Sequence, residues 1–387
     1  MPTLRGELPE YPWDAMAPYA ERAREHAGGM IDLSVGSPVD PTPGIVRRAL
    51  AEATDAHAYP ATAGAPALRE AIVEWFRRRR GVEVPLGGVL PSIGSKELVA
   101  LLPFLLGIGP GEAVVFPRVA YPSYAMGAAL VGADAVAADD PAEWPEHTRL
   151  IWVNSPGNPD GRVLDVPALQ AAVARARELG AVIVGDECYA ELGWDAPWDV
   201  ERIPSILDPR VLGRVDSGEH GGAPDLRGVL AAYSLSKQSN LAGYRAAFVA
   251  GDPALIAPLL TVRKHAGLML PAPVQAAMVA ALGDEDHVAA QRERYRGRRE
   301  ILRPALEAAG FRVDGSEAGL YLWVTRGTGA SDPDAWRMVS EFAELGILVG
   351  PGPFYGDHSP QHVRLSLTAA DEAVAAAADR LAVAAAS

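Results

Sequence analysis

Short apolar runs alternate with helical patterns along much of this 387-residue chain, and this alternation restricts its fold more than any other feature. The runs are rich in β-branched residues and have the length of buried strands. They comprise Ala113–Phe116, Leu150–Val153, Val182–Gly185, Val229–Tyr233 and Ala246–Ala250. Helical patterns, for example Ser123–Val131 and Val166–Leu179, lie between several of them. Strands that alternate with helices favour a mainly parallel sheet covered on both faces, so the sequence predicts an α/β fold.

The chain is too long for one compact core, and its pattern changes towards the C-terminus. An unusually long helical pattern covers Asp284–Ala309, and shorter strand and helix candidates follow it. These candidates are Phe311–Val313, Leu320–Val324, Asp334–Leu345, His362–Leu367 and Asp371–Ala384. We therefore expect an N-terminal arm with a small-domain segment over 1–35, a large domain over 36–283 and a smaller α+β domain over 284–387.

Charge and hydropathy argue against two classes of partner. The net charge is −14, which nucleic acids and anionic membranes would repel. Two basic stretches, Arg77–Arg80 and Arg292–Arg299, run against this average, and we interpret them as helix ends and solvated faces. The longest apolar run, Leu98–Gly109, is too short to span a bilayer. We expect neither a nucleic-acid nor a membrane partner.

The cysteine and histidine content indicates a reducing compartment and no metal site. Cys188 is the only cysteine, so no internal disulfide framework can form. The eight histidines are scattered along the chain, and we expect no metal site among them. The first residues, Met1–Asp14, lack the apolar core of a signal peptide, so we expect a cytoplasmic protein.

The strongest local signal is a lysine that follows a predicted buried strand. Lys237 comes shortly after Val229–Tyr233, at the carboxyl end of the predicted sheet, where open α/β folds bind their ligands. A lysine amine is a useful nucleophile when it forms an imine with a carbonyl group. A lone lysine after a strand is usually a surface residue. Here, small hydroxyl residues precede it and Arg245 follows it, which favours an anionic cofactor instead.

The segment from Ser234 to Ala247 resembles the cofactor-lysine signature of class-I aminotransferases, which are fold-type-I pyridoxal-phosphate (PLP) enzymes. The resemblance extends along nearly the whole chain. It implies a large domain, with a mainly parallel sheet between helices, and a smaller α+β domain. It also implies that Lys237 holds PLP and that the enzyme transfers an amino group from an amino acid to a 2-oxo acid, with 2-oxoglutarate and glutamate as the expected pair.

The resemblance assigns further residues to the cofactor ring. Asp186 would pair with the ring nitrogen and keep it protonated, so that the ring accepts electrons. Tyr189 and Asn158 would hydrogen-bond the ring hydroxyl, and Tyr121 would stack on the ring. Taken alone, Asp186 is typical of a turn after a strand and Tyr189 of core packing. The loop that carries Asn158 departs from the family pattern, because Asp160 replaces the commoner threonine.

The resemblance also implies a phosphate site at a helix N-terminus, whose free N–H groups and dipole attract an anion. The assigned residues are Gly94, Ser95, Lys96, Ser234, Arg245 and Tyr59. Tyr59 would reach the phosphate of a neighbouring subunit, which implies a homodimer with shared active sites. Without the resemblance, the Gly94–Lys96 turn would be interpreted as an ordinary helix cap.

The substrate site is expected around one arginine. Arg364 matches the arginine that binds the substrate α-carboxylate, because its planar fork suits bidentate recognition. Gly36 and Asn158 complete the expected site. Longer segments, including Asp32–Pro41 and Asp186–Trp194, resemble actinobacterial N-succinyldiaminopimelate aminotransferases.

A succinylated substrate carries a second carboxylate far from the reacting carbon, and that charge needs a partner once water is displaced. We expect Arg263 or Lys264 to bind it, with the segment Leu33–Pro38 lining the pocket. A solvated helix end is the alternative interpretation of Arg263 and Lys264.

Two other functions are compatible with the same residues. A cysteine-S-conjugate β-lyase would use the same lysine, aspartate and arginine. A PLP-binding regulator without turnover is the alternative outside enzymes. Such regulators usually carry a DNA-binding helix-turn-helix domain, for which we find no candidate segment in this acidic chain.

Overall fold

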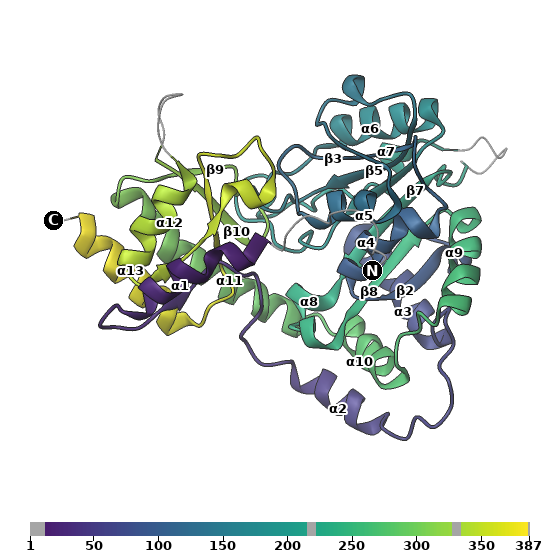
Figure 1. The fold of residues 1–387 in the computed structure, drawn as a ribbon. Coiled ribbons are helices and arrows are strands. Elements are labelled where there is room, and N and C mark those ends of the chain that lie inside the picture. The colour runs from purple at the N-terminus through teal and green to yellow at the C-terminus, as the bar shows by residue number, and fades with distance from the viewer. Residues whose placement is uncertain (1–11, 215–221, 327–333, 386–387) are drawn as a thin grey trace, which may run out of the picture.

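The computed structural model describes residues 12–214, 222–326 and 334–385, which form a large and a small body side by side (Figure 1). The first eleven residues of the expected N-terminal arm lie outside the described residues. Among the helices within these ranges, none has the length and apolar character needed to cross a membrane.

A seven-stranded sheet forms the centre of the large body. Its strands are β2 (Val89–Ile93), β3 (Ala113–Phe116), β4 (Asp134–Ala137), β5 (Thr148–Asn154), β6 (Val182–Asp186), β7 (Val229–Ser234) and β8 (Ala246–Gly251). They lie in the order β2-β8-β7-β6-β5-β3-β4, and of these seven only β8 runs antiparallel to the other six. The prediction of a mainly parallel α/β sheet is confirmed. The sequence pattern missed β2, which Pro91 and Ser92 interrupt, and the edge strand β4, which is short and largely exposed.

Helices cover both faces of the sheet, as a buried parallel sheet requires. They are α2 (Gly44–Glu52), α3 (Pro66–Trp75), α4 (Ser95–Leu105), α5 (Ser123–Val131), α6 (Val166–Leu179), α7 (Pro209–Leu212), α8 (Leu235–Gln238), α9 (Pro253–Ala266) and α10 (Ala272–Gly283). One apolar cluster includes α3, α6 and α10, and a second includes α4, α5 and α9. Along β5, Ile151 belongs to the first cluster and Trp152 to the second, because successive strand side chains point to opposite faces.

The helices that were predicted with the correct bounds are those with clear end signals. At the start of α6, Asp165 Oδ1 accepts a hydrogen bond from Ala168 N at 2.9 Å. Helix α6 ends at Gly180, with a φ of 64°, and α5 ends at Gly132, with a φ of 70°. A glycine adopts this left-handed conformation without steric cost, so it stops the helix at a defined residue.

The small body has its own sheet and its own apolar core. Its elements are α1 (Ala17–Arg24), β1 (Ile31–Asp32), α11 (Asp286–Ala308), β9 (Arg312–Asp314), β10 (Tyr321–Thr325), α12 (Ala335–Glu344), β11 (Ile347–Leu348), β12 (Gly350–Pro351), β13 (Val363–Ser366) and α13 (Asp371–Ala385). The sheet has the antiparallel order β12-β13-β10-β9, and β1 pairs with β11. The N-terminal segment therefore packs with the C-terminal part of the chain, as Figure 1 shows. The domain boundaries at residues 35 and 283 stay a prediction.

Both basic stretches contain an arginine that forms a buried ion pair. Arg80 contacts Glu187 at 3.1 Å, and the two side chains are 1% and 3% exposed. Arg298 contacts Asp40 at 2.6 Å and thereby connects α11 to the segment before α2. The interpretation as solvated faces holds for Arg77, which is 61% exposed, but it is wrong for Arg80 and Arg298.

Replacing Arg80 with methionine should lower the free energy of unfolding by about 3 kcal/mol, because Glu187 would stay buried without its cation. Urea unfolding followed by circular dichroism measures this loss. Arg77→Met is the matched control, since the exposed Arg77–Glu74 pair is screened by water and should change the free energy of unfolding far less. Equal losses in the two variants would contradict the assignment of Arg80 to a buried pair that stabilises the fold.

Candidate active site

The candidate residues lie at one edge of the large sheet because of the direction of its strands. The parallel strands β5, β6 and β7 end at Asn154, Asp186 and Ser234, and Asn154 is the register partner of Asp186. Lys237 follows β7 in the short helix α8. Since β8 runs in the opposite direction, Arg245, just before its first residue, lies at the same edge. Ligands of open α/β sheets bind outside these strand ends.

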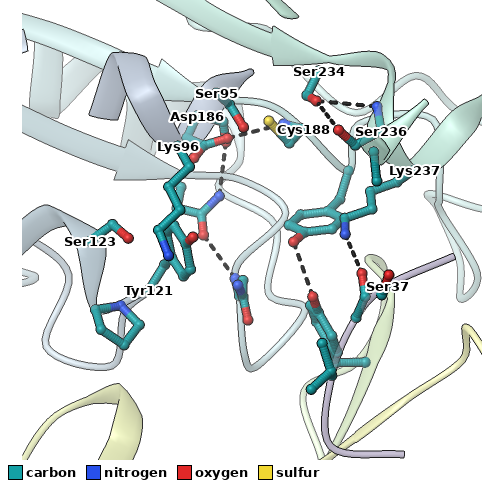
Figure 2. A pocket seen from close by; sticks show the side chains of 18 of the residues that line it. Ser37, Ser95, Lys96, Tyr121, Ser123, Asp186, Cys188, Ser234, Ser236 and Lys237 are labelled. Atoms are coloured by element: carbon teal, nitrogen blue, oxygen red, sulfur yellow. Dashed lines mark hydrogen bonds between the residues drawn. The ribbon is translucent and has the colours of Figure 1, made fainter. Parts of the chain in front are cut away.

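A cavity of about 500 Å³ lies at this edge, between the two bodies. Of the residues that the sequence assigned to the cofactor and to the substrate α-carboxylate, all except Gly94 and Tyr59 line it. In Figure 2, Ser95, Asp186 and Cys188 gather on one side, whereas Lys237 extends from another element towards the segment of Ser37. The expected pocket segment Leu33–Pro38 contributes Val35, Gly36 and Ser37.

Lys237 has the environment of a lysine that can lose its proton. Its Nζ donates a hydrogen bond to the carbonyl oxygen of Gly36. Burial lowers the pKa of Lys237; Tyr321 opposes this effect and the positive charge of Arg364 adds to it. A lowered pKa increases the fraction of neutral amine near pH 7, and the neutral amine is the nucleophile and the base.

Asp186 is a buried carboxylate whose two oxygens already accept hydrogen bonds. Tyr124 Oη donates to Oδ2 at 2.8 Å, and the backbone N–H of Cys188 donates to Oδ1 at 3.2 Å. Burial raises the pKa of Asp186, and hydrogen bonds from Cys188 and Tyr124 oppose that rise. A cation at this position would stabilise the ionised form further.

An anion cradle lies where β2 turns into α4. Gly94 has a φ of 79° and a ψ of 156°, which essentially only glycine adopts, and a Cβ on it would overlap the guanidinium of Arg245. Ser95 begins α4, so the N–H groups of the first turn face the cavity edge. On the opposite side, Ser234 Oγ donates to Ser236 Oγ at 2.9 Å. The geometry suits a phosphate group.

Arg364, in β13 of the small body, is aligned by hydrogen bonds and ring contacts. Its Nη1 donates to Asn158 Oδ1 at 2.9 Å, and its Nη2 donates to the Ser34 carbonyl at 2.6 Å. Its Cζ lies 3.9 Å from the ring centroid of Tyr321 and 4.8 Å from that of Tyr355. Within the part of the chain that the structure describes, the buried Nε has no hydrogen-bond partner. A guanidinium held in this way can bind a carboxylate.

Two of the residues singled out from the sequence lie elsewhere. Tyr59 is 93% exposed and does not line the cavity of its own chain. Arg263 is 1% exposed, and its guanidinium binds Glu97 through contacts of 2.8 and 3.1 Å. The expectation that Arg263 reads a distal carboxylate is therefore wrong, because a buried carboxylate of the same chain already occupies it. Lys264, its neighbour, is exposed.

The sequence analysis missed three cavity residues that contact the assigned ones. Tyr124 binds Asp186, and Tyr321 Oη lies 3.3 Å from Tyr189 Oη. The thiol of Cys188 also bonds Asp186. The position of Tyr124 in the first turn after Tyr121 was an available signal. The other two have no local signal, because one lies inside a turn and the other inside an apolar strand.

Three comparisons with known proteins agree with this geometry. Residues 28–381 match the family model "Aminotransferase class I and II". The chain is 55% identical over 376 residues to the 4-dedimethylamino-4-oxo-anhydrotetracycline transaminase OxyQ of Streptomyces rimosus, covering 97% of this chain and 99% of that protein. It is 52% identical over 380 residues to a "Probable aminotransferase" of Mycobacterium tuberculosis, covering 98% and 86%. The solved structure of a "probable N-succinyldiaminopimelate aminotransferase" from Thermus thermophilus is similar with a TM-score of 0.82 and 27% identity, covering 97% and 100%.

The cavity fits PLP, the cofactor of that family, by the chemistry of its donors. Arg245, Ser95 and the first turn of α4 offer cationic and N–H groups to a phosphate. Asp186 offers a buried carboxylate to a protonated ring nitrogen. Lys237 offers an amine of lowered pKa to the aldehyde carbon.

Replacing Gly94 with alanine should weaken PLP binding by about tenfold or more, because the backbone is strained for any other residue and the new Cβ displaces Arg245. Titration of the apoenzyme with PLP, followed by absorbance, gives the dissociation constant. Gly109→Ala is the control, since a Cβ at Gly109 meets no atom within 4 Å. An unchanged PLP affinity in Gly94→Ala would contradict the assignment of the cradle.

Proposed function

Since the chain belongs to the class I and II aminotransferases, we propose that it transfers an amino group between an amino acid and a 2-oxo acid in the cavity around Lys237. One observation carries the proposal. Lys237, Asp186 and Arg364 come from distant parts of the sequence, and all three line a single cavity whose donors match the cofactor. Glutamate and 2-oxoglutarate are the proposed common pair.

The proposed roles follow from what each side chain can do. Arg364 binds the α-carboxylate of the substrate and so orients its Cα–H bond in the cavity. Lys237 removes the Cα proton with its neutral amine, which burial favours. Asp186 holds negative charge beside the ring nitrogen, and Tyr189 with Asn158 binds the ring hydroxyl. PLP, when bound, supplies the electron sink that makes the Cα proton acidic.

Lys237→Ala should abolish the pH-sensitive absorbance band of bound PLP and nearly all amino transfer. The reason is that Lys237 would be both the attachment point of the cofactor and the base. Spectrophotometry of the purified variant with added PLP measures the band, and a coupled assay measures turnover. Lys264→Ala, which changes an exposed lysine, should keep the band. A retained band or full turnover in Lys237→Ala would refute the central assignment.

We also propose a homodimer in which Tyr59 acts on the neighbouring subunit. This tyrosine is 93% exposed and lies outside the cavity of its own chain. A phenol so exposed has no structural role in the monomer that burial could explain. A residue that serves the partner's phosphate would have this placement.

The proposed amino acceptor is the succinylated 2-oxo acid of diaminopimelate synthesis. Support comes from the matched segments Asp32–Pro41 and Asp186–Trp194, and from the similarity to the Thermus thermophilus structure. We do not propose that Arg263 binds the distal carboxylate, because the guanidinium of Arg263 already forms an ion pair with Glu97.

A second candidate is amination of a bulky ring ketone. The relative that is 55% identical is named for a transaminase that acts on an oxo-anhydrotetracycline. The cavity wall also contains apolar and aromatic side chains that suit a ring system, namely Pro12, Trp13, Val35, Tyr121 and Met126. In this candidate function the amino transfer at Lys237 is the same. Only the part of the substrate beyond the reacting carbon differs.

A panel of acceptors with glutamate as donor should separate these proposals. The succinylated acceptor should react with a kcat/KM about tenfold or more above that of pyruvate, because extra binding groups lower the barrier. Preference for a polycyclic ketone would instead support the second candidate. A β-lyase would release pyruvate and ammonia from cystathionine-like substrates, and glutamate would not convert the bound cofactor to its amine form.

A further inference from the structure

Tyr321 is a cavity residue that the roles given above do not use. It lies in β10 of the small body, is 4% exposed and lines the cavity. Its hydroxyl is 3.3 Å from that of Tyr189, and the two rings meet edge to face with centroids 5.7 Å apart. The guanidinium of Arg364 lies over its ring at 3.9 Å. Tyr321 therefore connects the residue proposed for the ring hydroxyl with the residue proposed for the substrate carboxylate.

The glycine at position 36 leaves the space that the Tyr321 hydroxyl occupies. A Cβ on Gly36 would overlap Tyr321 Oη, and apart from the chain neighbours of Gly36 the three nearest atoms of the described residues all belong to Tyr321. Lys237 Nζ donates its hydrogen bond to the carbonyl of the same glycine. The Tyr321 hydroxyl thus lies beside Lys237 as well as Tyr189, and it stays there only because residue 36 has no side chain.

Counting protons defines what Tyr321 can do. A tyrosine hydroxyl has one proton to donate and can also accept hydrogen bonds. If Tyr189 donates its proton to the cofactor ring oxygen, then the hydrogen bond between the two tyrosines must use the proton of Tyr321. We propose that Tyr321 is a positioning residue that donates to Tyr189 and thereby strengthens the hydrogen bond from Tyr189 to the ring oxygen. This inference rests on the role proposed for Tyr189.

The electrostatics of the pair favour this direction. Burial raises the pKa of Tyr321, but the charges of Arg364 and Lys237 outweigh burial and leave that pKa below its usual value. Burial and the neighbouring Tyr321 raise the pKa of Tyr189 well above its usual value. The more acidic hydroxyl is the better donor, and chains of hydrogen bonds polarise one another. Tyr321 is therefore the donor and Tyr189 the relay.

A measurable consequence concerns the nitrogen of Lys237 when it is linked to PLP. A negative ring oxygen stabilises a proton on that nitrogen, and a hydrogen bond to the oxygen reduces its charge. A stronger bond from Tyr189 therefore lowers the pH at which the absorbance band of the bound cofactor titrates. Removing the Tyr321 hydroxyl should weaken the hydrogen bond from Tyr189 and therefore raise the pH at which the band titrates.

Tyr321→Phe holoenzyme should titrate with its midpoint shifted upward by about half a pH unit, as expected for the partial loss of one hydrogen bond. The ring under Arg364 is retained, so the KM for glutamate should stay within about twofold while kcat falls severalfold. Tyr355→Phe is the matched control for the titration. Its ring also contacts Arg364, but its hydroxyl has no partner within the described part of the chain, so its midpoint should not move.

Repeating Tyr321→Phe in a Tyr189→Phe background tests the route of the effect. The upward shift should disappear there, since the relay is already absent. The inference alone fails if Tyr189→Phe moves the midpoint and Tyr321→Phe does not, or if the Tyr321→Phe shift is equally large in both backgrounds. If Tyr189→Phe leaves the midpoint unchanged, the role proposed for Tyr189 fails, and this inference fails with it.

Discussion

A buried carboxylate without a cation from its own chain lies at the centre of the described structure. Asp186 and Glu187 are neighbours, and both are less than a tenth exposed. Arg80 forms an ion pair with Glu187. Among the described residues, Asp186 receives only hydrogen bonds, from Tyr124 and Cys188. Burial of an unpaired charge is costly, which is why the pKa of Asp186 is raised. In the role that we propose for Asp186, the protonated ring nitrogen of PLP would supply the missing cation, so cofactor binding would stabilise this strand end.

The candidate site takes residues from both bodies. The residues proposed to hold the cofactor come from strand ends of the large sheet, whereas Arg364 and Tyr321 come from the small one. Helix α11 fixes one body against the other near the reacting groups: Tyr295 Oη donates to the Lys237 carbonyl at 3.2 Å, and Arg298 binds Asp40. A shift of α11 would therefore move the substrate anchor relative to Lys237. Alignment of Arg364 with Lys237 thus depends on polar contacts between α11 and the residues that surround it.

The sequence predicted the parts of the site that local patterns encode, and it failed where partners are distant. Lys237 and Asp186 each follow an apolar strand, and the direction of parallel strands brings such residues to one edge. Tyr321 gave no signal, because inside the apolar strand β10 it has the pattern of a core residue. Arg263 was misread because Glu97, its partner at the start of α4, is distant in sequence. Burial of an ion pair is a property of the fold, and no spacing along one helix reveals it.

The cavity is electropositive although the chain as a whole is acidic. Its charged lining residues are Lys96, Lys237, Arg245, Arg364 and Asp186. The surrounding protein has a low dielectric constant and concentrates the electric field of these cationic side chains in the cavity. The cavity can therefore attract anionic ligands although the whole chain, with a net charge of −14, repels them. A phosphate and one α-carboxylate match Arg245 and Arg364. The remaining wall combines apolar side chains, among them Trp13, Val35 and Met126, with hydroxyl groups such as those of Ser37 and Ser123. Substrate choice beyond the α-carbon would therefore depend on this mixed wall and on what a partner subunit adds to it in the dimer that we propose, whereas the amino transfer proposed at Lys237 depends on the charged residues of the cavity itself.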